Sequence, residues 1–197
     1  MVVEECGDPD TAIRIIERSL GSWHAYYARS AVEAGVASTL LLRLSGKPVA
    51  SAVVYLADLG SVKLGVMYYV AVEKRWRGKG LGKVLVLSAE EAMGLRGASG
   101  YVATTTIDNR ASMNLFSSLG YVVLSWDAIG RRYGWRAVEN LVRATCGYED
   151  DVAMVKPVGM KLGRLLELIS AAGKRRVSRL WSRICYRPWL VLWRGSS

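Results

Sequence analysis

The chain has 197 residues, with 27 lysines and arginines against 17 aspartates and glutamates, a formal net charge of +10. Its composition, 51% hydrophobic and 22% charged, excludes a disordered basic protein, and the length suits a domain with a sizeable core. The charge is uneven: residues 1–154 hold 17 basic and 16 acidic side chains, whereas residues 155–197 hold 10 basic side chains and one acidic. The question of an anionic partner therefore belongs to the end of the chain and not to its nearly neutral body.

Counts of single residue types exclude further classes of protein. His24 is the only histidine, which excludes multi-histidine metal sites, so we expect no metal. The cysteines are odd in number and form no C-x-x-C pair, so neither a zinc knuckle nor a disulfide framework is expected from Cys6, Cys146 and Cys185. The longest apolar run, Leu64–Val72, is too short to cross a membrane, and the first residues lack a signal-peptide pattern. We expect a cytoplasmic protein, and the absence of glutamine with only three asparagines favours a thermophilic source.

The first half of the chain predicts a strand, two helices and three strands. The helices are indicated by Asp8-Pro9-Asp10, with proline near a first turn, and by Gly35, a typical residue after a helix end. A β-hairpin is indicated by the turn Ser45-Gly46-Lys47-Pro48 between two apolar runs. The expected elements are a strand at 2–6, helices at about 10–20 and 22–34, and strands at 39–44, 49–56 and 62–72.

The second half alternates helices and strands. We expect a helix at 82–93, a strand at 101–106, a helix at 110–119, a strand at 121–126 and a strand at 152–156. The basic, aromatic segment at 130–143 receives no assignment. This order predicts a mixed α/β domain of the α+β kind.

The basic end of the chain predicts helices. One helix is expected within 162–169. A second is indicated by an apolar stripe with helical spacing, Val177, Leu180, Trp181, Ile184 and Cys185, beside a stripe of Arg176, Arg179, Arg183 and Arg187. Pro188 is expected to end it, leaving residues 189–193 as a short strand or hook. The apolar stripe either packs on the domain with its arginines in water, or the segment docks on RNA, an acidic peptide or a membrane surface.

A glycine-rich stretch follows the strand expected at 62–72 and comes directly before a helix. Its glycines, in the sequence 77–83, let the backbone approach a ligand at the positive end of the helix, and Arg77, Lys79 and Lys83 add positive charge. This pattern is typical of a pyrophosphate-binding turn. The spacing fits neither a P-loop nor the G-x-G-x-x-G dinucleotide fingerprint.

Two motifs together resemble the GNAT superfamily of N-acetyltransferases. Arg77-Gly78-Lys79-Gly80-Leu81-Gly82 resembles its R/Q-x-x-G-x-G/A signature, and residues 109–121, from Asn109 to Gly120-Tyr121, resemble its N-x-x-[AS]-x-x-L-[YF]-x-x-L-G-[FY] block. The resemblance implies a mixed, mostly antiparallel sheet flanked by helices over residues 1–157. Residues 158–197 lie outside it and are expected to form a basic helical extension packed on or next to the domain. It also implies acetyl-CoA as the acetyl donor.

The resemblance assigns roles to the residues of these motifs. Backbone groups of Val70, Ala71 and Val72 would hold the pantetheine arm, with the Val70 N–H as oxyanion donor. The pyrophosphate would lie on Arg77, Gly78, Lys79, Gly80, Leu81, Gly82 and Lys83. Asn109, Ser112 and Phe116 would contact the other side of the donor.

The sequence departs from the family pattern at two catalytic positions. Phe116 stands where many members have a tyrosine that protonates the leaving thiolate. Since a thiolate is a tolerable leaving group, this loss weakens the acid step without abolishing transfer, and Tyr121, Ser117 and Tyr133 are the candidates to replace the tyrosine. Val66 stands where some members have a glutamate base. The general base is left open between Tyr68 and Glu73, with Asp58 and His24 as further candidates.

The kind of amine that acts as acceptor can be inferred from the cost of removing its proton. Removing a proton from a lysine amine at pH 7 costs about 3.4 pKa units, or about 4.6 kcal/mol, whereas an α-amino group costs about one unit. Because no strong base is evident, we expect a peptide N-terminus or a small amine as acceptor. The resemblance implies that this acceptor would bind beside Trp23, His24 and Tyr27, in the region of the first two helices. The alternatives are a GNAT-fold acyl-CoA-binding module and an RNA- or ribosome-associated protein with weak or no catalysis.

Overall fold

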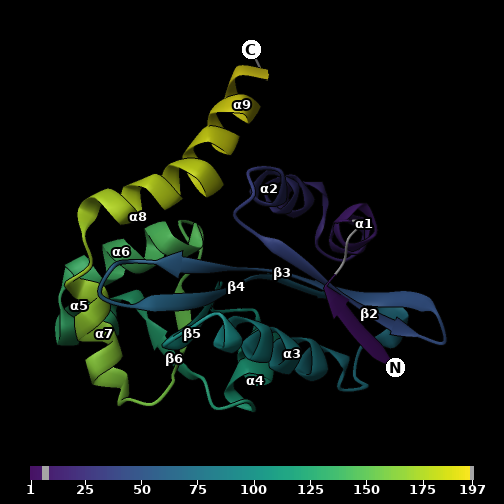
Figure 1. Ribbon diagram of the computed structural model, residues 1–197, viewed down its shortest axis with the longest axis horizontal. Coiled ribbons are helices and arrows are strands. Elements are labelled where there is room, and N and C mark those ends of the chain that lie inside the picture. The colour runs from purple at the N-terminus through teal and green to yellow at the C-terminus, as the bar shows by residue number, and fades with distance from the viewer. Residues whose placement is uncertain (6–8, 196–197) are drawn as a thin grey trace.

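The computed structural model describes residues 1–5 and 9–195, and its seven described strands form one twisted sheet in the order β1-β2-β3-β4-β5-β7-β6 (Figure 1). All neighbouring strands pair antiparallel except β4 and β5. This is the mixed, mostly antiparallel sheet that the sequence predicts. The strands are β1 (Val2–Glu5), β2 (Ser38–Leu44), β3 (Lys47–Asp58), β4 (Lys63–Val72), β5 (Gly100–Thr105), β6 (Val122–Ser125) and β7 (Val152–Pro157).

Helices cover both faces of the sheet. One face carries α3 (Leu81–Leu95) and α4 (Arg110–Ser117), and the other carries α1 (Pro9–Leu20), α2 (Ser22–Glu33), α5 (Trp126–Tyr133), α6 (Trp135–Thr145), α7 (Leu162–Ser170) and α8 (Lys174–Trp181). Strand alternation divides the core between the faces: Leu41 packs under α1 and α2, while its neighbours Leu40 and Leu42 pack against α3. Asp8, expected at the start of the first helix, lies outside the described residues.

The sheet opens between its two central strands. β4 and β5 pair only from Leu64↔Gly100 to Val66↔Val102, and beyond Val66 the two strands share no pairing. The β3–β4 register also shifts between Val53 and Val54, which leaves Tyr68 as the extra residue of a β-bulge. The second half of β4 therefore stays with β3, the end of β5 stays with β7, and a gap opens between the two strands.

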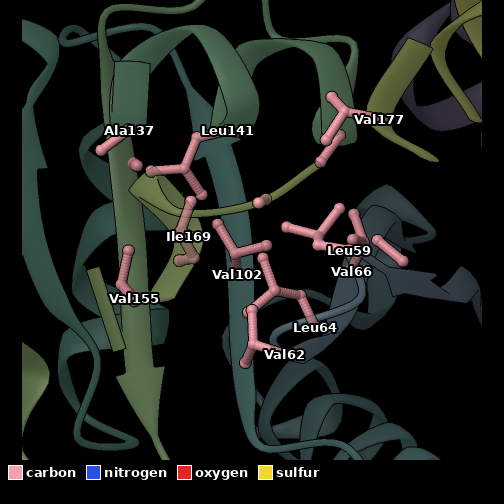
Figure 2. Packing of buried hydrophobic residues seen from close by; sticks show 14 of the residues in the cluster. Leu59, Val62, Leu64, Val66, Val102, Ala137, Leu141, Val155, Ile169 and Val177 are labelled. Atoms are coloured by element: carbon pink, nitrogen blue, oxygen red, sulfur yellow. The ribbon is translucent and has the colours of Figure 1, made fainter. Parts of the chain in front are cut away.

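The largest core cluster fills the unsplit part of the sheet. Val66 lies in it with Val102, Leu141 and Ile169, beneath Val177 of α8 (Figure 2). The position where some relatives carry a glutamate base is thus occupied by a fully packed aliphatic side chain, 1% exposed.

Two helical regions differ from the sequence analysis, one left unassigned there and one predicted wrongly. Segment 130–143, left unassigned, belongs to α5 and α6. The two helices are separated at Gly134, whose φ of +90° is a backbone conformation that favours glycine. Residues 189–193, expected as a strand or hook, lie in helix α9 (Arg187–Gly195). Pro188 is the second residue of α9 and directly follows a π-helical turn, so the helical chain continues through it instead of ending there.

The C-terminal segment, residues 174–195, continues from α8 through a π-helical turn (Ser182–Tyr186) into α9, which extends away from the sheet at the top of Figure 1. Val177, Ile184 and Cys185 are buried in the same core cluster as Val66. Arg176 forms a 2.8 Å ion pair with Asp58, and Arg183 donates to the Ala34 carbonyl. The apolar stripe thus packs on the domain.

A disulfide joins Cys146, at the end of α6, to Cys185 in the C-terminal segment, with 5.6 Å between the Cα atoms. The expectation that the cysteines form no disulfide framework is therefore wrong for this pair. Two cysteines 39 residues apart in sequence become neighbours only because α8 folds back over α6. Cys6 lies outside the described residues.

None of the described helices combines the length and the apolar character that crossing a membrane requires.

Candidate active site

A cavity of about 1200 Å³ occupies the gap between β4 and β5. One end is lined by the glycine turn, residues 77–82, and by the first turns of α3 and α4. The other end, called here the acceptor end, is lined by α2, by the loop before β7 and by the C-terminal segment. Its residues are Trp23, His24, Tyr27, Tyr148, Glu149, Asp150, Trp181, Tyr186 and Trp189.

The glycine turn is built for close approach of a ligand to the backbone. Gly78 and Gly80 have φ +74° and +78°, left-handed values that glycine adopts without strain, and Gly80 is the N-cap of α3. No atom lies within 4 Å of where a Cβ would stand on either glycine. The first N–H groups of α3 have no intrahelical acceptor and carry partial positive charge, so this end of the cavity suits a pyrophosphate.

The basic side chains of the turn are not equivalent. Arg77 is held by the backbone, because its Nε donates to the Val72 carbonyl at 3.0 Å and its guanidinium to the Ser19 carbonyl at 3.3 Å. Lys79 Nζ lies over the Trp76 ring, 4.8 Å from its centroid. Lys79 is not one of the described residues that line the cavity. Arg77 and Lys83 line the cavity, as do Gly78, Gly80, Leu81 and Gly82.

The second motif forms the start of α4. Asn109 is its N-cap: its side chain accepts from the Ser112 N–H at 3.1 Å and donates to Thr105 at 2.9 Å. Asn109, Ser112 and Phe116 all line the cavity. Phe116 is 3% exposed and packs edge-to-face on Tyr121, with 4.9 Å between ring centroids.

The possible replacements for the missing tyrosine lie elsewhere. Tyr121, Ser117 and Tyr133 are not among the described residues that line the cavity. Tyr121 packs behind Phe116, which separates it from the open space.

The separated end of β4 lines the middle of the cavity. Val70, Ala71 and Val72 lie along it, with Tyr68 and Tyr69 before them. Burial raises the pKa of Tyr68 well above its ordinary value, and its hydroxyl lies 3.4 Å from the Ile184 carbonyl. Tyr68 thus stays protonated near neutral pH.

Two other candidate bases from the sequence are engaged in ion pairs. Glu73 contacts Arg18 at 3.4 Å and Arg75 at 3.3 Å, and it is not one of the described cavity residues. Asp58 is paired with Arg176. Of the sequence-derived candidates, only Tyr68 and His24 therefore reach the cavity.

The acceptor end combines aromatic rings with negative charge. Trp23 and Tyr27 of α2 pack at 5.3 Å between ring centroids, and His24 meets Tyr69 edge-on at 5.5 Å. Across from them, the rings of Trp181, Tyr186 and Trp189 stack in succession at 4.9 and 6.2 Å. Aromatic faces and carboxylates are the groups that attract an ammonium ion.

Asp150 is a cavity residue that the sequence reasoning missed. Burial raises the pKa of its carboxyl group, a Thr104 hydrogen bond opposes this, and the carboxylates of Asp151 and Glu149 raise the pKa further, while His24 lowers it. The acidic run Glu149-Asp150-Asp151, directly before a predicted strand, was the available signal. It could not be used without knowing that this loop ends beside Thr104 and Thr105 of β5.

Among the described residues, no group of three or more histidine, cysteine, aspartate or glutamate side chains is placed to hold a metal ion.

Comparisons with known proteins agree with this architecture. A model of the acetyltransferase (GNAT) family matches residues 12–121. Over 75 residues the chain is 33% identical to a mycothiol acetyltransferase of Renibacterium salmoninarum, a match covering 38% of this chain but only 22% of that protein.

Solved structures show the same fold at low sequence identity. The ribosomal-protein-S18-alanine N-acetyltransferase from Escherichia coli superposes with a TM-score of 0.56 at 19% identity, covering 81% of this chain and 95% of that one. A GNAT family N-acetyltransferase from Escherichia coli, solved in complex with CoA, gives a TM-score of 0.52 at 19% identity, covering 61% and 68%.

Proposed function

Because the chain belongs to the GNAT acetyltransferase family, we propose that this acetyltransferase moves the acetyl group of acetyl-CoA to a primary amine. The observation that carries the proposal is the single cavity that joins the glycine turn to the acidic, aromatic acceptor end through the gap between β4 and β5. A pyrophosphate-bearing donor and a cationic acceptor would meet along β4 in such a cavity.

The donor would be held mainly by backbone groups. The N–H groups at the start of α3 would bind its pyrophosphate, with Arg77 and Lys83 adding charge, and Val70 to Val72 would pair with its pantetheine arm. The amine nitrogen would attack the thioester carbonyl carbon, with the Val70 N–H as donor to the developing oxyanion. Breaking the C–S bond would release the thiolate of CoA, a leaving group stable enough to depart without the tyrosine that Phe116 replaces.

The acceptor would be a cation in its resting state. Glu149 and Asp150 with the surrounding rings favour an ammonium ion over a neutral or anionic group. A peptide N-terminus or a small amine of similarly low pKa is the preferred acceptor, because an α-amino group gives up a proton at a cost of about one pKa unit at pH 7.

The test is release of CoA from acetyl-CoA with a panel of short peptides carrying a free N-terminus, small primary amines and an Nα-blocked lysine. We expect turnover with the α-amines first. Bound acetyl-CoA without turnover on any amine would contradict the enzymatic role and favour the acyl-CoA-binding alternative.

Gly80→Asp tests the donor site. A carboxylate at the N-cap of α3 would occupy the site of the pyrophosphate and repel its negative charge. We expect it to raise the dissociation constant of acetyl-CoA, measured by calorimetry, at least about 100-fold. Gly46→Asp is the matched control, because Gly46 has φ +76°, equal open space and no part in the cavity. Equal affinities for the two variants would show that the pyrophosphate binds elsewhere.

A further inference from the structure

We propose that Asp150 is the catalytic residue that takes the proton from the acceptor amine, an inference that rests on the proposed function. The family position for a glutamate base holds the buried Val66, and Glu73 and Asp58 are engaged with arginines. Asp150 is instead a carboxylate in the wall of the cavity itself.

The backbone holds Asp150 at a defined place. Trp126 Nε1 donates to the Asp150 carbonyl at 2.6 Å, and the next residue, Asp151, donates its N–H to the Thr105 carbonyl at 3.1 Å. The first bond ties the loop to the start of α5 and the second ties it to the end of β5, on the side of the gap opposite Val70 of β4. The carboxyl group contacts the Thr104 hydroxyl there.

The other acids of the loop are less suited to the role. Asp151 Oδ2 accepts from the Ile107 N–H at 2.9 Å, which turns it toward the loop before α4. Glu149 is exposed and lies at the outer part of the acceptor end. Asp150 alone of the three is partly buried, lines the cavity and has a contact on β5.

Charged and titratable groups from four elements surround Asp150. Those that interact with it are Glu149 and Asp151 of its own loop, His24 of α2 and Tyr69 of β4. Further out lie Tyr27 of α2, beside Glu149, and Arg143 of α6, beside Tyr148 of the loop. Burial and the two neighbouring carboxylates raise the pKa of Asp150, against Thr104 and His24. A higher pKa makes its carboxylate a stronger base, which brings it closer to matching an α-amine.

The step balances without a further reactant. The acceptor R–NH3⁺ gives one proton to the Asp150 carboxylate and becomes R–NH2, whose lone pair forms the new C–N bond with the thioester carbon. Collapse of the intermediate breaks the C–S bond, and CoA leaves as thiolate with the electron pair. The second nitrogen proton leaves the amide, and protonated Asp150 returns its proton to thiolate or solvent. The products are the acetylamide, CoA and one net proton.

The experiment compares Asp150→Asn with Asp151→Asn, its neighbour in the same loop whose side chain faces the Ile107 N–H and does not line the cavity, using a peptide with a free N-terminus. At pH 7 we expect Asp150→Asn to lower kcat/KM about 100-fold or more, within the usual range for loss of a general base, and Asp151→Asn to change it less than about fivefold. The dissociation constant of acetyl-CoA should be the same for all three proteins. Asp150→Glu, which retains a carboxylate, should keep activity within about tenfold.

The pH profile separates catalysis from structure. As the pH rises through the amine's own pKa, solvent removes the proton and the deficit of Asp150→Asn should shrink to about tenfold or less by pH 9. A deficit that stays constant with pH, or full activity of Asp150→Asn at pH 7, would overturn the proposal. Because turnover by the unsubstituted enzyme is measured first, that result would leave the proposed function standing.

Discussion

Glu90 and Lys156 join two layers of the protein through a largely buried ion pair. Lys156 Nζ of β7 lies 2.6 Å from Glu90 Oε2 of α3, and Glu90 is only 9% exposed. An ion pair in such a place gains little over an apolar pair of the same size. Removing one partner, however, leaves an uncompensated charge in the interior.

Lys156→Met is therefore expected to lower the free energy of unfolding by about 3 kcal/mol, measured by urea denaturation. The exposed Lys161→Met is the control and should change it by less than about 0.5 kcal/mol. Adding Glu90→Leu to Lys156→Met should recover most of the loss. A single variant as stable as the starting protein would show that solvent reaches Glu90 and compensates its charge.

At the residue scale, the sequence revealed those features that depend on residues close by in the chain. The left-handed glycines 78 and 80 and the N-cap Asn109 act within a few residues of chain, so their spacing reveals them. Asp150 depends on Thr104 and His24, which come from β5 and α2. No local pattern could connect these three residues.

Helix α9 contributes Trp189 to the acceptor end. Trp189 is 44% exposed, lines the cavity and stacks on both Tyr186 and Trp193. Its segment is fixed in place by the Tyr26 hydroxyl, which donates to the Pro188 carbonyl at 3.0 Å. Trp189 is thus held in position while much of its surface stays open.

Trp189→Ala should raise the KM of the amine acceptor about tenfold, equivalent to the loss of about 1.4 kcal/mol of aromatic contact. The dissociation constant of acetyl-CoA should not change, because the glycine turn lies at the other end of the cavity. Trp193→Ala, which removes the next ring of the stack outside the cavity, is the matched control. Equal effects of the two substitutions on KM would contradict a contact between Trp189 and the acceptor.

At the element scale, prediction succeeded where apolar periodicity was strong. The strands from β2 to β5 and helices α1 to α4 lie close to their expected ranges. It failed for α5 and α6, where Gly130 and Gly134 interrupt the pattern; the first lacks a side chain because Trp135 packs against it. It also failed for α9, since proline usually ends a helix, whereas here the helical chain continues past Pro188 from a π-helical turn.

The disulfide ties the C-terminal segment to the body of the molecule. Its two cysteines close a loop of 39 residues that includes β7, α7 and α8. A cross-link over a loop of this length stabilises a protein by up to about 4 kcal/mol through the entropy of the unfolded chain.

Cys146→Ser combined with Cys185→Ser should therefore lower the free energy of unfolding by about 2–4 kcal/mol in urea denaturation. A reductant should lower the stability of the unsubstituted protein by a similar amount and leave the double variant unchanged. Insensitivity of the unsubstituted protein to reductant would argue against a stabilising cross-link.

At the scale of the whole molecule, the sequence predicted an apolar stripe at the C-terminus but not the surface it covers. Val177 and Ile184 pack on a core built from β3, β4, β5 and α6, whose arrangement follows from sheet topology. The fold was therefore predictable, whereas the meeting of the C-terminal segment with α2 at one end of the cavity was not.

The uneven charge gives the two substrates different approaches to the same cavity. With a net charge of +10, the molecule presents a positive potential at distances of a Debye length, about 8 Å at physiological ionic strength. Under the proposed function, a polyanionic donor would be drawn in by this long-range field, and its capture would be a steered diffusional encounter. A cationic acceptor would meet repulsion until it passed within reach of Glu149 and Asp150, so its selection would occur only at contact range.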